Sequence, residues 1–390
     1  FVCDVGREYT RAMKFGRYIV GIGYRWVVKP VLFRISPDHV HQRMVRFVCL
    51  VQRCGVVRWL ARTTIAAQSP GVTRQFGNLT LLNPVGIAAG FDKNAQTTPL
   101  LAALGCGFVT IGSVTLQPRY GNPRPWFYRL PRTKSLVVNA GLANDGVEAA
   151  IANLRQTERQ RGSMPVIASV ALVASQASQT PAAMVDEALQ CADRLAASGQ
   201  VAALEFNISC PNVCDDQLFS QPAQFRLLAQ AITARGYNLP VTIKMPLTHS
   251  DTQFDDLLAI ASQHAIDGLT IANLEKDRQR VQLSDDLPPT VPGGLSGAVT
   301  YQRSNQLITR ARRLYGQRFF IIGVGGIFSP ADARAKLAAG ADAVALITGM
   351  MFTGPQLMAS IVADISPATP VAAAKSHLQP PGRTKSQKKS

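Results

Sequence analysis

Residues 319–347 read FFIIGVGGIFSPADARAKLAAGADAVALI and contain one complete strand–helix–strand unit. An apolar run (319–326) ends in a glycine turn, a helical pattern begins at Ser329 or Pro330, and a second apolar run (341–347) follows. Apart from Asp342, both runs are apolar instead of alternating with polar residues, which is typical of parallel strands buried on both faces. The stretch therefore predicts a β/α unit of a parallel sheet.

The same unit recurs along the chain. Between the apolar runs lie helical patterns, such as residues 181–199, which end at a glycine. A series of eight β/α units favours a closed barrel over an open doubly wound sheet, so we predict an α/β fold, a (β/α)8 TIM barrel with an N-terminal helical extension. The eight runs are residues 83–90, 107–113, 165–171, 201–208, 240–246, 267–273, 319–326 and 341–347.

The positive charge is concentrated at the two ends of the chain. The chain has 41 Lys/Arg and 24 Asp/Glu. Residues 1–80 hold 13 basic and 3 acidic residues, and residues 371–390 hold 5 basic and no acidic residues. The segment between them, residues 81–370, therefore holds 23 basic and 21 acidic residues. A nearly neutral body argues against a nucleic-acid groove across it, and no aromatic interleaving accompanies the basic ends, so we expect no nucleic-acid partner. Basic ends favour contact with an anionic surface.

Residues 36–63, SPDHVHQRMVRFVCLVQRCGVVRWLART, predict a basic amphipathic helix pair that starts at Ser36 and Pro37. Such helices can lie in a membrane interface, which predicts a peripheral protein on the cytoplasmic face; the alternative is that they pack on the barrel with the arginines in solvent. The sequence contains no run of about 18 apolar residues, so we predict no helix that spans a membrane. We expect N-terminal helices over residues 1–75, the barrel over 76–367 and a disordered basic tail over 368–390.

The seven cysteines are scattered and odd in number, which indicates reduced thiols in place of a disulfide framework. Cys210 and Cys214 are four residues apart, but no second Cys or His pair accompanies them. We therefore expect no metal site.

Polar residues collect where the predicted strands end, which is the active-site end of such barrels. Asn139, Asn207, Asn212 and Asn273 each offer a donor and an acceptor, so together they suit a ring with alternating C=O and N–H groups, as in a pyrimidine. Alone, each could simply cap a turn.

Two further groups at these strand ends suit anions. Lys93 and Lys244 follow apolar runs and need anionic partners if buried, although Lys244 could instead extend to solvent. The GVGG turn (323–326) and the ITG that ends the last strand (347–349) form a phosphate site of the kind barrels carry. FMN fits this pattern better than a dinucleotide, because the chain has no GxGxxG motif with an acidic residue about 20 positions after it, as a dinucleotide fold requires.

The motifs NPVGIAAGFDKN, GSVTLQPRYGNPRPWFYRLP, NISCPN, GGLSG, GVGGI and GPQL, in this order, resemble the dihydroorotate dehydrogenase family over residues 30–365. The leading KPVLFRISPDHVHQRM is similar to the N-terminal helices of its membrane-associated, quinone-using class (class 2). The resemblance implies FMN-dependent oxidation of dihydroorotate to orotate in pyrimidine (UMP) biosynthesis, with electrons passed to a quinone.

The resemblance also implies roles for individual residues. It makes Cys210 the general base, which takes a proton from C5 of the substrate while a hydride leaves C6. Positions that match substrate ligands are Lys93, Asn139, Ala140, Gly141, Leu142, Asn207, Asn212 and Asn273. Positions that match the flavin site are Ala88, Ala89, Gly90, Phe91, Asp92, Ser113, Ser169, Asn207, Lys244, Ala272, Gly297, Gly325, Gly326, Ile347 and Thr348.

Four positions depart from the class 2 pattern. The SCPNV around Cys210 is the pattern of the soluble classes, which have a cysteine base where class 2 has serine; a thiol with an ordinary pKa near 8.5 needs no hydroxyl relay. The loop NAGLAN (139–144) is one residue shorter than in class 2, Leu274 and Glu275 replace two threonines, and ASVALVAS (168–175) lacks the usual asparagine and lysine. Two alternatives stay open: a soluble acceptor such as fumarate or NAD, and an inactive peripheral membrane scaffold.

Overall fold

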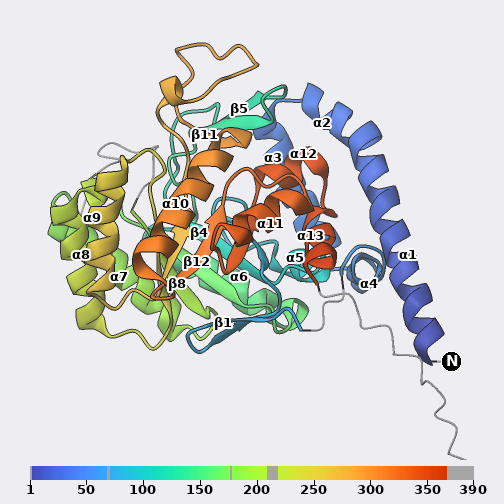
Figure 1. Ribbon diagram of the computed structural model, residues 1–390, viewed down its shortest axis with the longest axis horizontal. Helices are drawn as coiled ribbons and strands as arrows, with labels where there is room; N and C mark the ends of the chain where they lie inside the picture. The colour runs from blue at the N-terminus through green and yellow to red at the C-terminus, as the bar shows by residue number, and fades with distance from the viewer. Residues whose placement is uncertain (1, 68–70, 176–177, 209–217, 367–390) are drawn as a thin grey trace, which may run out of the picture.

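A computed structural model describes residues 2–67, 71–175, 178–208 and 218–366, with side chains from residue 13 onward. Eight parallel strands form a closed barrel (Figure 1), and each overlaps one of the predicted runs, so the predicted TIM barrel is confirmed. The ring closes where Val85 of the first strand pairs with Val344 of the last. The strands are β3 (Val85–Ile87), β4 (Phe108–Val114), β7 (Val166–Ala171), β8 (Ala203–Asn207), β9 (Val241–Lys244), β10 (Gly268–Ile271), β12 (Phe320–Val324) and β13 (Ala343–Leu346).

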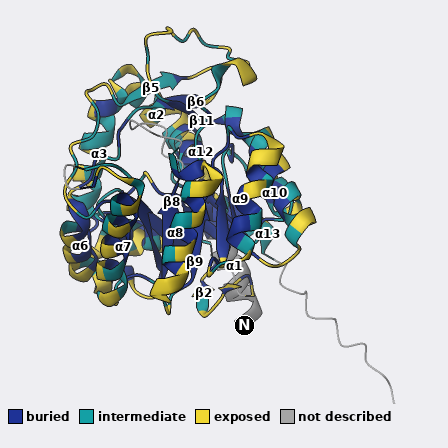
Figure 2. Cartoon of the chain, turned by 90° about the vertical axis from the view of Figure 1, so that its left-hand side faces the viewer, coloured by how far each residue is buried: buried dark blue, intermediate teal, exposed yellow. Residues whose placement is uncertain are grey.

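Helices surround the barrel and bury their apolar faces against its outer surface (Figure 2). Their starts follow local sequence signals: Ser329 caps α11 with Pro330 at its first position, and Ser250 and Gln253 form a reciprocal capping box at α9. The helices are α5 (Thr98–Ala103), α6 (Gly146–Arg161), α7 (Pro181–Ala197), α8 (Pro222–Arg235), α9 (Asp251–Ser262), α10 (Tyr301–Tyr315), α11 (Pro330–Ala338), α12 (Thr348–Thr353) and α13 (Leu357–Ile365), with 3-10 turns η2 (Leu218–Ser220), η3 (Arg278–Arg280) and η4 (Ala298–Thr300).

A hairpin of β1 (Arg74–Phe76) and β2 (Leu79–Leu81) closes the amino end of the barrel. Phe76 is buried and stacks on Phe320 with ring centroids 4.6 Å apart. Gly268 leaves room for this ring, because a Cβ there would lie 3.1 Å from it. The amino end is therefore filled with apolar side chains, and ligands have to be bound at the other end.

A small antiparallel sheet lies over the carboxyl ends of the barrel strands (Figure 1, top). Its hairpin, β5 (Phe127–Leu130) and β6 (Ser135–Val138), follows β4, and its third strand, β11 (Gly294–Gly297), comes from the connection between β10 and α10. The Asp285 carboxylate accepts hydrogen bonds from the amides of Arg132 and Thr133 in the hairpin turn, which joins the two connections. The sequence analysis did not predict this sheet.

The N-terminal helices are α1 (Val2–Gly23), α2 (Lys29–Arg34), α3 (Pro37–Val51) and α4 (Gly55–Thr64), with a π-helical turn η1 (Tyr24–Val28) between α1 and α2. The predicted helix pair is present as α3 and α4, and α3 begins at Pro37 as predicted. The group packs on the barrel side through buried residues such as Met13 and Ala61, while Trp26 and Phe47 are exposed. None of the helices in the described ranges is long and apolar enough to cross a membrane.

Candidate functional site

A chain of polar side chains crosses the carboxyl ends of four strands. The amide of Asn273, just after β10, donates to Asn207 Oδ1 (3.3 Å), and Asn207 Nδ2 donates to Ser113 Oγ (2.9 Å). The Ser113 and Ser169 hydroxyls are 2.9 Å apart. Asn207, Ser113 and Ser169 are buried because alternate residues of barrel strands point inward. These contacts fix the orientation of both amides, which leaves Asn273 at the pocket with defined donor and acceptor positions.

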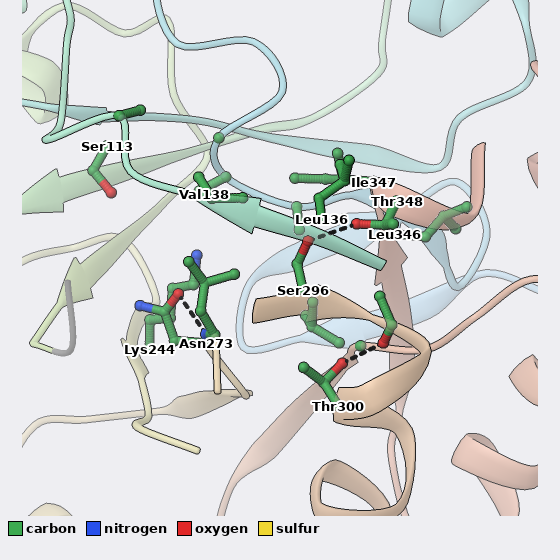
Figure 3. Close-up of a pocket in the computed structure, with 18 of the residues that line it drawn as sticks. Ser113, Leu136, Val138, Lys244, Asn273, Ser296, Thr300, Leu346, Ile347 and Thr348 are labelled. Atoms are coloured by element: carbon green, nitrogen blue, oxygen red, sulfur yellow. Dashed lines mark hydrogen bonds between the residues drawn. The ribbon is translucent and has the colours of Figure 1, made fainter. Parts of the chain in front are cut away.

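Two lysines, Lys93 and Lys244, line the same pocket as this polar chain, and Figure 3 shows Lys244 beside Asn273. Lys244 is the buried last residue of β9 and pairs in register with Asn207 on one side and Thr270 on the other. Lys93 lies in the loop after β3, with its ammonium 4.6 Å from the ring centroid of Trp126. The positive groups and the amides share one pocket, so the site suits a ligand that carries both negative charge and hydrogen-bonding groups.

A glycine cradle forms the opposite wall, at the ends of β12 and β13. Gly325 and Gly326 have φ of +105° and +69°, a backbone conformation that favours glycine. Next to them the hydroxyls of Ser296 and Thr348 lie 3.0 Å apart (Figure 3). Successive amides in such a turn, with hydroxyl groups beside them, suit a phosphate.

The small sheet and helix α3 complete the wall of the pocket. Leu136 and Val138 from β6 and Phe127 from β5 line it, together with His41 from α3. His41 lies 5.4 Å from Phe127, ring to ring. Burial, and next the nearby Lys93 ammonium, lower the pKa of His41 to about 4, so the imidazole is neutral at physiological pH.

The pocket has a volume of about 1240 Å³ when its open mouth is included. Most of the predicted site residues line it: Ala88, Ala89, Gly90, Lys93, Ser113, Ala140, Gly141, Leu142, Asn207, Lys244, Ala272, Asn273, Gly297, Gly325, Gly326, Ile347 and Thr348. Cys210 and Asn212 lie outside the described residues.

Four predicted residues are near the pocket without lining it. Ser169 lies behind Ser113, and Asn139 accepts a hydrogen bond from Asn122 (2.8 Å). Phe91 packs against the main core. Asp92 is buried, and its carboxylate accepts hydrogen bonds from the backbone amides of Gln96 (2.7 Å) and Thr97 (2.8 Å). Burial raises the pKa of Asp92, and these two hydrogen bonds oppose the rise. Phe91, Asp92 and Asn139 belong to loops around the pocket, and Ser169 belongs to β7.

Several lining residues were not predicted from the sequence: His41, Phe127, Leu136, Val138, Ser296, Thr300 and Met351. They come from α3, the small sheet and the starts of α10 and α12, which no strand-end pattern marks. The motifs quoted above do contain His41, Phe127 and Ser296, and that is the signal that could have identified them.

The two replaced threonine positions have different environments. Leu274 lines the pocket and adds an apolar surface to it. Glu275 is buried below, where its carboxylate accepts hydrogen bonds from the Thr248 hydroxyl (3.1 Å) and the Asp277 amide (2.9 Å). The carboxylate therefore fixes the loop after β10 and is not in contact with the pocket.

Comparison with known proteins identifies relatives over most of the chain. The family model for dihydroorotate dehydrogenase matches residues 72–368. A dihydroorotate dehydrogenase (quinone) of Verminephrobacter eiseniae is 34% identical, over 85% of this chain and 92% of the relative's chain. A dihydroorotate dehydrogenase (quinone) of Burkholderia thailandensis is 33% identical, over 86% of this chain and 95% of the relative's chain. The crystal structure of DHODH from Eimeria tenella in complex with ferulenol has the same fold, with a TM-score of 0.69, 22% identity, and coverage of 86% of this chain and 93% of that chain.

Proposed function

This chain belongs to the dihydroorotate dehydrogenase family, and from that premise we propose that it oxidises dihydroorotate to orotate in pyrimidine biosynthesis and passes the electrons to a quinone. One observation carries the proposal: the Asn273–Asn207–Ser113 chain, Lys244 and the glycine cradle face the same pocket. A ring with alternating C=O and N–H groups matches the amides, and a phosphate-bearing cofactor matches the cradle.

The pocket fits FMN. Gly325 and Gly326 have no space for a side chain, because a Cβ would lie 2.5 Å from the Thr300 hydroxyl and 2.4 Å from the Cβ of Tyr301. The backbone amides are thus left open to a phosphate, with the Thr348 hydroxyl beside them, while Lys244 would hold the ring system. When bound, FMN supplies the hydride acceptor for the substrate.

The substrate would be held by the amides and a lysine. Asn207 and Asn273 would each hydrogen-bond the pyrimidine ring, and Lys93 would pair with the substrate carboxylate. We assign Cys210, outside the described residues, as the base that removes the C5 proton. A thiol has an ordinary pKa near 8.5, so a fraction of it is ionised near neutral pH without a relay.

The N-terminal helices would dock on the anionic, cytoplasmic face of a membrane, where quinones are dissolved. Large apolar side chains on these helices are exposed, including Phe15 (66%), Trp26 (75%), Leu50 (68%) and Trp59 (60%). Exposed arginines at positions 43, 46, 53 and 62 accompany them. Exposed aromatic and apolar groups with basic neighbours are typical of helices that lie in a membrane interface. His41 places the pocket next to these helices.

Stopped-flow mixing tests substrate and acceptor separately. Dihydroorotate should bleach the flavin absorbance, and a quinone in anionic vesicles should restore it faster than fumarate or NAD. Faster restoration by fumarate would favour the soluble acceptor, a reading that the Cys210 pattern supports. A colourless protein that takes up no FMN would favour the inactive scaffold.

Replacement of thiols tests the base. Cys210→Ala should slow flavin reduction by dihydroorotate by about a hundredfold or more, the range of general-base catalysis. Cys54→Ala is the matched control, because Cys54 is an exposed thiol at the start of α4 and does not line the pocket. Equal rates in the two variants would place the proton acceptor elsewhere.

Membrane docking has its own test. Trp26→Ser with Trp59→Ser should reduce sedimentation with anionic vesicles and quinone turnover, and should leave turnover with a water-soluble dye unchanged. Tyr120→Ser is the control, since Tyr120 is 96% exposed on the loop between β4 and β5. Equal losses of turnover with the quinone and with the dye would show that these helices have no specific role in the reaction with the quinone.

A further inference from the structure

A lysine is fully buried behind the glycine cradle. Lys336, on α11, has no exposed surface, and its ammonium donates to Ser304 Oγ (3.0 Å) and Asn305 Oδ1 (2.7 Å) on α10. Its stem passes behind Gly323 of β12, where a Cβ would lie 2.7 Å from the Cγ and Cδ of Lys336. The strand that leads into the cradle therefore needs glycine at this position to admit the lysine.

The ammonium is not neutralised by a direct ion pair with any carboxylate in the described part of the chain. Asp332, one turn earlier on α11, is the acidic group whose charge acts on it, but its Oδ2 already accepts hydrogen bonds from the Phe328 amide (3.0 Å) and the Ser329 hydroxyl (2.9 Å). On the side of Gly340, Arg312 and Asp342 pair at 2.7 Å and offset each other.

Burial lowers the pKa of Lys336 to about 7, and Asp332 acts in the opposite direction. The ring of Tyr301 also lies near the ammonium, with its centroid 5.4 Å away. A buried cation with mainly neutral partners costs free energy, so a source of negative potential nearby would favour the protonated form of Lys336.

The partners of Lys336 also contact the cradle. Ser304 Oγ, which accepts from Lys336, donates to the carbonyl of Val324, the residue before Gly325 (2.6 Å). Tyr301 lies directly against Gly326, as the 2.4 Å approach to its Cβ shows. The cradle thus separates the lysine from the pocket by one layer of backbone. Charges across such a dry layer interact strongly, because little water screens them.

We infer that Lys336 is a positioning residue for the cofactor phosphate, whose negative charge it stabilises through the glycine cradle without contact. This inference rests on the proposed binding of FMN. The phosphate dianion should in turn favour the protonated lysine, so FMN binding takes up a proton between about pH 7 and pH 9, where the phosphate itself is already ionised. Affinity for FMN then falls as the pH rises through this window.

Comparison of FMN with riboflavin, which lacks the phosphate, isolates the effect. Full-length protein is freed of flavin, and rebinding of each flavin is followed by fluorescence quenching at pH 7 and pH 9. At pH 7, Lys336→Met should weaken FMN binding about tenfold, or about 1.4 kcal/mol, and leave riboflavin binding unchanged. Wild-type affinity for FMN should fall by a similar factor at pH 9, while the variant shows no such fall.

The control is Arg334→Met, which removes an exposed cation from the same helix, one that pairs with Asp364. An unchanged ratio of FMN to riboflavin affinity in Lys336→Met would overturn the inference. Wild-type protein that binds neither flavin would instead contradict the proposed function. Titration calorimetry of the wild type in buffers of different ionisation enthalpy measures proton uptake without any variant, and absence of uptake with FMN at pH 8 would also overturn it.

Discussion

The contact between helix α3 and strand β5 depends on one buried carboxylate. Asp38, 5% exposed, accepts hydrogen bonds from the amides of Trp126 (3.0 Å) and Phe127 (3.3 Å) and from the Arg124 guanidinium (3.4 Å). Hydrogen bonds to a charged group contribute about 1.5–3 kcal/mol each, but two of these three are long. We therefore expect Asp38→Ala to lower the free energy of unfolding by about 3 kcal/mol, measured by urea denaturation.

The same variant should affect the acceptor step more than flavin reduction. Asp38 holds the helix that carries His41 against the strand that carries Phe127, whereas Asn207 and Ser113 belong to the barrel strands. If about half of the lost free energy appears in the acceptor step, quinone turnover falls about tenfold, while flavin reduction by dihydroorotate changes little.

The control for this prediction is Asp256→Ala, an exposed carboxylate on α9. A change in unfolding free energy below about 0.5 kcal/mol for Asp38→Ala, the range of ordinary surface substitutions, would refute the reasoning. So would equal losses in flavin reduction and quinone turnover, because they would show that the helix does not act on one step alone.

Three further predictions concern the barrel. In flavin-free protein, burial lowers the pKa of Lys336 from its ordinary 10.5 to about 7, so between these pH values the unfolded state binds more protons than the folded state. The free energy of unfolding should therefore rise across this range, by at most about 5 kcal/mol. Lys336→Met should abolish the rise, which urea titrations at several pH values measure. Phe76→Ala should lower the free energy of unfolding by about 3–5 kcal/mol and leave turnover of the folded enzyme unchanged; lost turnover in folded protein would contradict the assignment of this end as structural. Gly326→Ala should reduce FMN content more than Gly316→Ala, because both have positive φ but a Cβ at Gly316 meets nothing within 4 Å; equal flavin content would contradict crowding at the cradle.

The barrel was predictable because its strands carry their own signal. The run 319–326, for example, is apolar on both faces, and each of the eight runs overlaps an observed strand. The small sheet carries no comparable signal, since β5 and β6 have four residues each and β11 lies in a long connection. Its pairing depends on contacts such as that between Asp285 and Thr133, which are far apart in sequence.

The site was predictable where its residues end strands. Asn207, Lys244 and Gly325 meet at the pocket because parallel strands bring their carboxyl ends together. The positions of His41 and Lys336 follow from helix packing against the barrel, which no local pattern encodes. Family membership, inferred from ordered motifs, is confirmed by the family model over residues 72–368.

The closure of the ring between β3 and β13 has a consequence for biosynthesis. Residues 85–87 pair with residues 344–346, so the first strand remains without one neighbour until nearly all of the chain has left the ribosome. Contacts that are so distant in sequence form slowly, and an open strand edge is prone to aggregation in the meantime. We therefore expect the nascent chain to depend on chaperones, and truncations before residue 344 to yield insoluble protein.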